Sequence, residues 1–123
     1  MPTIAILGAS SERRKFGNKA VRAYLSAGWT VHPVNLAGET VEGMPGYRRL
    51  ADVPGPLDRV SVYLPPPVTL DLLPEIAAVS PGQVWFNPGA ADRTVVDEAH
   101  RLGLPVVEGC SIVDIGRSPS QFP

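Results

Sequence analysis

The chain has 123 residues, of which 44% are hydrophobic, enough for one compact domain with one buried core and too little for two. Its formal net charge of −1 leaves no large basic surface for nucleic acid. A single cysteine excludes an internal disulfide, and we expect a cytoplasmic protein because no leader or membrane-length apolar run is present.

Apolar runs of strand length alternate along the chain with helical patterns. Strands are predicted at residues 3–7, 29–35, 59–64, 83–86 and 105–108, with a short strand or helical turn near 47–50. Helices are predicted from Asn18 to a stop at Gly28, over residues 68–79 with a break or restart at Pro74, and from an Asp92 cap to Gly103. This order predicts one α/β domain over residues 1–123, with a Rossmann-like, doubly wound, mainly parallel sheet and helices on both faces. Residues 116–123 lack periodicity and are expected to form a loose tail or to pack on the surface.

The loops after the strands carry the candidate site, because open parallel sheets bind ligands beyond the carboxyl ends of their strands. The first loop contains Gly8 and Gly17, which permit close approach of the main chain to an anion. The helix that follows would contribute backbone N–H groups and the positive end of its dipole. A ligand that carries phosphate is therefore predicted.

Two details argue against an ordinary nicotinamide site. The first loop has no G-x-G-x-x-G, and Asn35 stands where an acidic side chain would bind the ribose of NAD. Arg13, Arg14 and Lys15 instead offer cations for several phosphate charges. An NADP-dependent oxidoreductase, with Arg13 and Arg14 on the 2′-phosphate, stays open as an alternative.

GASSERRKFGNKAVRAYLSAGWTVHPVN, followed by VSVYLPPP and FNPGAAD, resembles the small stand-alone CoA-binding proteins over nearly the whole chain. Their domain is similar to the amino-terminal CoA-binding domain of the succinyl-CoA synthetase alpha subunit. The resemblance implies that coenzyme A or an acyl-CoA is held by the glycine loop and the proline-rich loop. Carried over by position, the implied contacts are Gly8, Ala9, Ser10, Lys15, Phe16, Gly17, Pro33, Asn35, Leu64, Pro65 and Pro66. Leu36 follows Asn35 where the family commonly has proline, so the second loop is expected to take a different path.

Simpler interpretations stand beside these. The basic run at 13–15 is also typical of a solvent-exposed loop that binds nothing. The prolines at 65–67 are also typical of residues that only end a strand. Cys110 is interpreted as a small buried hydrophobe, and His32 and His100 lack partners at metal-ligand spacing, so no metal site is predicted. No catalytic residue is assigned. The function predicted is CoA binding, in a sensor, carrier or nucleotide-binding regulatory domain whose protein partner is not indicated.

Overall fold

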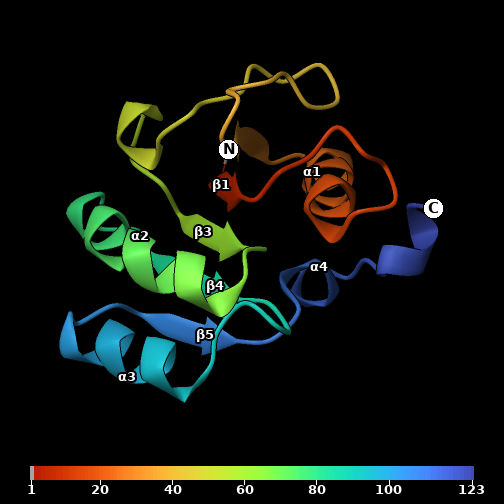
Figure 1. Ribbon diagram of the computed structural model, residues 1–123. Helices are drawn as coiled ribbons and strands as arrows, with labels where there is room; N and C mark the ends of the chain where they lie inside the picture. Colours follow the sequence, from red (N-terminus) through yellow and green to blue (C-terminus); the bar gives the residue numbers. More distant parts are fainter. Residues whose placement is uncertain (1) are drawn as a thin grey trace.

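The computed structural model describes residues 2–123 and contains a five-stranded sheet between two layers of helices (Figure 1). The strands are β1 (Thr3–Leu7), β2 (Thr30–Val34), β3 (Arg59–Val62), β4 (Gln83–Phe86) and β5 (Val106–Glu108). The helices are α1 (Phe16–Ser26), α2 (Pro66–Ala78), α3 (Arg93–Arg101) and α4 (Ser111–Asp114), with 3₁₀ turns at Leu50–Asp52 and Pro119–Gln121. All strand pairs are parallel, in the order β2-β1-β3-β4-β5, so the predicted Rossmann-like α/β fold is confirmed. Met1, the first residue of the predicted domain, lies outside the described residues.

Side-chain alternation along β1 builds the core on both faces of the sheet. Ile4 and Ile6 pack with α1 and α4, whereas Ala5 and Leu7 pack with α2 and α3 on the opposite face. Figure 1 shows the same division, with α1 and α4 on one side of the sheet and α2 and α3 on the other. Both faces are covered, as the continuous apolar strands predict.

The predicted helix boundaries are accurate where a cap residue marks them. Gly28 follows α1 with a φ of 85°, a conformation that glycine adopts without strain. The Asp92 side chain accepts a hydrogen bond from the Val95 N–H at 3.0 Å and so caps α3. Helix α1 begins at Phe16, two residues before the predicted start.

One segment differs from the prediction, and another agrees with it. The predicted break at Pro74 is wrong, because α2 continues through this exposed proline. The buried side chains of Leu73 and Ile76, on either side of Pro74, hold the helix against the core. Near residues 47–50, Tyr47 makes one isolated bridge to Val34 and a 3₁₀ turn follows. Residues 117–123 pack on the surface of α1. No helix between residues 2 and 123 combines the length and apolar character of a membrane span.

Candidate functional site

The candidate site lies at the carboxyl edge of the sheet, where β1 separates β2 from β3. Chain order reverses across β1, and such switch points are where ligands bind in open α/β sheets. The loop after β1 touches both neighbours: the Gly8 N–H donates to the Val34 carbonyl at 3.0 Å, and the Tyr63 N–H donates to the Leu7 carbonyl at 2.9 Å. The glycine loop and the proline-rich loop therefore lie side by side.

A cleft of about 480 Å³ opens between these two loops and the start of α1. Its lining includes residues predicted from the sequence: Gly8, Lys15, Phe16, Gly17, Leu64, Pro65 and Pro66. The remaining lining comes from the ends of β3 and β4: Tyr63, Pro88, Gly89 and Ala90. Two hollows join this cleft because they share lining residues with it, and we call the three spaces together the groove.

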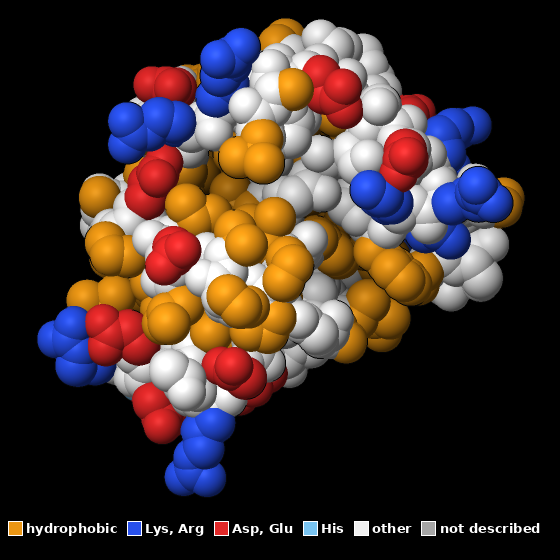
Figure 2. Space-filling view, viewed as in Figure 1, with side chains coloured by type: hydrophobic (Ala, Val, Ile, Leu, Met, Phe, Trp, Pro, Cys, Tyr) orange, Lys and Arg blue, Asp and Glu red, His pale blue; other side chains and the backbone are white. Residues whose placement is uncertain are grey.

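The first hollow, of about 340 Å³, is apolar and lies on the β2 side of the cleft. It shares Gly8, Leu64 and Pro65 with the cleft, and Asn35 lines it as predicted. Val34, at the end of β2, lines it as well. The sequence analysis did not identify the other residues of its walls: Leu7, Leu36, Arg48, Arg49, Leu50, Val68, Leu72 and Glu75. The spacing of Val68 and Leu72, four apart on α2, was the signal that could have indicated a shared apolar face. Figure 2 shows hydrophobic side chains gathered in the middle of this view, with charged side chains around them.

The second hollow is narrow, about 120 Å³, and is lined by Phe16, Tyr63, Asn87, Pro88 and Cys110. Cys110 packs against the core on the α1 side, as expected of a structural residue, but it is half-buried rather than fully buried and also lines this hollow. The three spaces follow one another along the carboxyl edge, from β2 toward β4.

Gly8 and Gly17 are needed for packing within the protein. A Cβ on Gly8 would lie 2.5 Å from the Tyr63 carbonyl oxygen, and Gly8 has a φ of 86°. A Cβ on Gly17 would collide with the Gly8 carbonyl oxygen. These two glycines let the first loop, β3 and α1 come together at the floor of the cleft.

The start of α1 brings backbone N–H groups to the lining of the cleft. Gly8 and Ala9 both donate to the Val34 carbonyl, at 3.0 and 3.3 Å, and so are engaged within the protein. In the first turn of α1, the N–H groups of Phe16 and Gly17 have no hydrogen-bond partner within residues 2–123. Unpaired N–H groups of this kind at a helix start bind anions, and Lys15 is beside them.

Of the three predicted cations, the structure places only Lys15 on the cleft. Its Nζ lies 3.0 Å from the Glu12 carboxylate, and Arg13 pairs with Glu42 at 3.6 Å. Arg13 and Arg14 line a separate surface hollow together with Glu12. Within the described chain Arg14 makes no ion pair.

Three further predicted residues lie away from the groove. Ala9 is buried in the α1 core, and the Ser10 hydroxyl accepts a hydrogen bond from the Glu12 N–H at 3.0 Å. Pro33 is buried inside β2 opposite Ile6 and lines none of the three spaces. These residues support the loops that form the groove.

A buried polar cluster adjoins the narrow hollow, because two of its members, Tyr63 and Asn87, line that hollow. The Ser111 hydroxyl lies 2.7 Å from the Ser61 hydroxyl and 3.2 Å from the Tyr63 hydroxyl, and Asn87 accepts a hydrogen bond from the Ser111 N–H at 2.9 Å. Burial raises the pKa of Tyr63 to about 12, so its phenol stays protonated at neutral pH. Tyr63 thus offers hydrogen bonding rather than proton abstraction. Within residues 2–123, no three His, Cys, Asp or Glu side chains come together to hold a metal ion.

The sequence and the structure both have relatives among known proteins. Residues 2–116 match the family described as the CoA binding domain. The chain is 26% identical over 117 residues to the alpha subunit of ADP-forming acetate–CoA ligase II of Pyrococcus furiosus, a match that covers 85% of this chain. The match covers 25% of that subunit, so the chain spans about a quarter of the length of this curated relative.

Solved structures share the fold over nearly the full chain. A conserved hypothetical protein of Pyrococcus furiosus superposes with a TM-score of 0.85 at 29% identity, covering 93% of this chain and 99% of that one. A protein of Thermus thermophilus gives a TM-score of 0.85 at 33% identity, covering 92% of this chain and 87% of the other. These relatives match the arrangement of strands and helices that forms the groove.

Proposed function

Because this chain belongs to the CoA binding domain family, we propose that it binds coenzyme A or an acyl-CoA along the groove, as a sensor or carrier of that ligand. The observation that carries the proposal is the order of the three spaces. The cleft, with its unpaired N–H groups and Lys15, lies between an apolar hollow and a narrow hollow. Coenzyme A has the same order, since its pyrophosphate joins an adenosine to a pantetheine arm.

Each space fits one part of the ligand. The hollow of about 340 Å³, with Val34, Leu50 and Leu72 in its walls, suits the flat adenine ring. The pyrophosphate would lie against the N–H groups of Phe16 and Gly17 beside Lys15, where charge and hydrogen bonding favour an anion. The slender pantetheine arm would follow Phe16 and Tyr63 toward the hollow of about 120 Å³.

The proline-rich loop supports the same placement. Pro65 lines both the apolar hollow and the cleft, and Pro66 lines the cleft. Proline has a restricted φ and no N–H, so this part of the wall is stiff and leaves no unpaired donor against an apolar ligand. The prolines would therefore form the wall shared by the adenine and pyrophosphate sites.

Thermal unfolding with a panel of ligands tests the proposal. A ligand at about 100 times its Kd stabilises the folded state by about 2.7 kcal/mol, which for a domain of this size raises the melting temperature by roughly 10 °C. We expect such a saturable rise with CoA or acetyl-CoA and little with NAD or NADP. A larger rise with NADP than with CoA would favour the oxidoreductase alternative, and native mass spectrometry of the purified protein would identify any ligand retained from the cell.

A further inference from the structure

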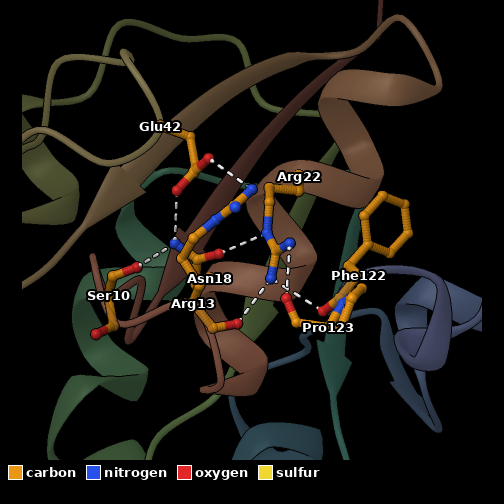
Figure 3. Close-up of polar contacts among 7 residues, drawn as sticks. All are labelled: Ser10, Arg13, Asn18, Arg22, Glu42, Phe122 and Pro123. Carbon is orange, nitrogen blue, oxygen red and sulfur yellow. Dashed lines mark hydrogen bonds and ion pairs between the residues drawn. The ribbon is translucent and has the colours of Figure 1, made fainter.

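Arg22, on α1, holds the backbone of the basic loop that leads into the cleft (Figure 3). Its guanidinium donates to the Arg13 carbonyl at 2.7 Å, and its Nε donates to the Asn18 Oδ1 at 2.7 Å. The guanidinium thus forms hydrogen bonds with a main-chain carbonyl of the loop and with a side chain of its own helix. Arg22 lines none of the three spaces of the groove.

Asn18 holds the same loop through a second hydrogen bond. It is fully buried, and its Nδ2 donates to the Ser10 carbonyl at 2.8 Å and to the Glu42 carboxylate at 3.1 Å. Asn18 and Arg22 are four residues apart and therefore lie on one face of α1. Together they fix the loop at two carbonyls, those of Ser10 and Arg13.

Fixing these carbonyls orients the rest of the loop. In a planar trans peptide the N–H points opposite to the preceding carbonyl, so the N–H groups of Ser11 and Arg14 are turned away from α1. The Ser11 N–H accordingly meets the Glu39 carboxylate at 3.4 Å. The loop then reaches Lys15 two residues after the Arg13 carbonyl, so Arg22 holds the backbone close to this lysine.

The same guanidinium also binds the last residues of the chain. It donates to the Phe122 carbonyl at 2.9 Å and to the Pro123 carbonyl at 3.2 Å, and it lies 5.8 Å from the centre of the Phe122 ring. Figure 3 shows Arg13 on one side of the Arg22 guanidinium and Phe122 and Pro123 on the other. One side chain is therefore shared between the loop at the cleft and the segment that packs on α1.

We infer that Arg22 is a positioning residue for the anionic ligand: it holds residues 10–15 in the conformation that presents Lys15 to the cleft. The inference rests on the proposed function for the identity of the ligand. Its structural part, the ordering of the loop by Arg22, is measurable on the free protein.

Arg117 offers a matched control. It lies in the same segment and donates to the Ser26 hydroxyl at 3.0 Å and to the Ser26 carbonyl at 3.3 Å, so it also ties residues 117–123 to α1. Its contacts are at the far end of that helix and do not reach the loop. Arg22→Met and Arg117→Met therefore remove comparable anchors of the segment, and only the first one releases the loop.

The experiment measures CoA affinity, melting temperature and amide hydrogen exchange for both variants. We expect Arg22→Met to weaken CoA binding about tenfold, the effect of losing charge-assisted hydrogen bonds that order the loop. We expect Arg117→Met to stay within about twofold of the wild type, with a similar fall in melting temperature. Amides 11–15 should exchange faster in Arg22→Met alone, and this part requires no ligand.

Two further variants separate positioning from charge. Arg22→Lys keeps the cation but lacks the planar fork that spans carbonyls on both sides, so it should recover less than half of the lost binding energy. In a Lys15→Ala background, Arg22→Met should have a much smaller effect, because it acts through that lysine. Full recovery by lysine, additive losses, or equal effects of the Arg22 and Arg117 variants would overturn the inference. Absence of CoA binding by the wild type would refute the proposed function instead, and the exchange of amides 11–15 would still decide the role of Arg22.

Discussion

Replacing Lys15 by alanine should lower CoA affinity about tenfold. A charge-assisted contact with a phosphate in a partly desolvated cleft contributes about 1.5–3 kcal/mol. In the free protein Lys15 already pairs with Glu12 at 3.0 Å, with 65% and 67% of the two side chains exposed, and such surface pairs contribute about 0–1 kcal/mol. The difference is close to the 1.4 kcal/mol that corresponds to about a factor of ten.

Isothermal titration with CoA and dephospho-CoA measures this change. Glu12→Gln should raise affinity, because it frees Lys15 without removing the Glu12 carbonyl that accepts from the Lys15 N–H. Arg101 is the control, since it also pairs with a carboxylate three positions earlier but lies at the C-terminal end of α3, at the opposite edge of the sheet. Arg101→Ala should leave affinity unchanged.

Comparing the affinity losses for CoA and dephospho-CoA shows which phosphate Lys15 contacts. A smaller loss for dephospho-CoA would place Lys15 on the 3′-phosphate, and equal losses would place it on the pyrophosphate. Unchanged CoA affinity in Lys15→Ala at low salt, where screening is weakest, would refute the reasoning. The basic run would then be a solvated loop.

Three other changes test separate parts of the molecule. Replacing Pro65 and Pro66 by glycine should weaken CoA binding more than it lowers stability, and preserved affinity in a destabilised protein would reduce these prolines to strand terminators. Cys110→Ser should keep CoA affinity within about threefold, since the hydroxyl is close in size to the thiol, whereas a mixed disulfide with CoA that the serine variant cannot form would assign Cys110 to the site. Burial lowers the pKa of His32 below 6.5, so its contribution to stability is present above that pH and is lost as pH falls below it. His32→Gln should therefore reduce the loss of unfolding free energy between about pH 7.5 and 5.5 in urea titrations, and an unchanged loss would contradict this.

The fold was predictable because the strands are mainly apolar runs, several of them bounded by glycine or proline as β1 is by Pro2 and Gly8, and because cap residues such as Asp92 mark the helix ends by a local hydrogen bond. Pro74 misled the prediction because the cost of proline in a helix is a local property, whereas α2 is held by tertiary burial of Leu73 and Ile76. Local sequence patterns were therefore sufficient to predict the order of strands and helices. They failed at Pro74, where tertiary packing determines whether the helix continues.

The candidate site was predictable only in its loops. Chain order brings Gly8, Lys15 and Pro65 to strand ends, and parallel strands end at one edge. The apolar hollow is also lined by Leu36 and Arg48, from the long loop after β2. The periodicity of hydrophobic residues does not predict how that loop folds back over the sheet edge. Its position depends on β2 lying next to β1, which is a property of the whole sheet.

The charges of the basic loop show the same dependence on distant parts of the chain. Glu42 and Gly43 both have positive φ, 49° and 80°, in a tight turn closed by hydrogen bonds between Val41 and Met44, and non-glycine residues adopt this conformation at some cost. The turn brings the Glu42 carboxylate to Arg13. A count of cations in the sequence therefore overstates the positive charge open to a ligand, since Arg13 is engaged by a residue 29 positions later. Under the proposed function, a phosphate that enters the cleft would meet Lys15 and would bind there by replacing the carboxylate of Glu12.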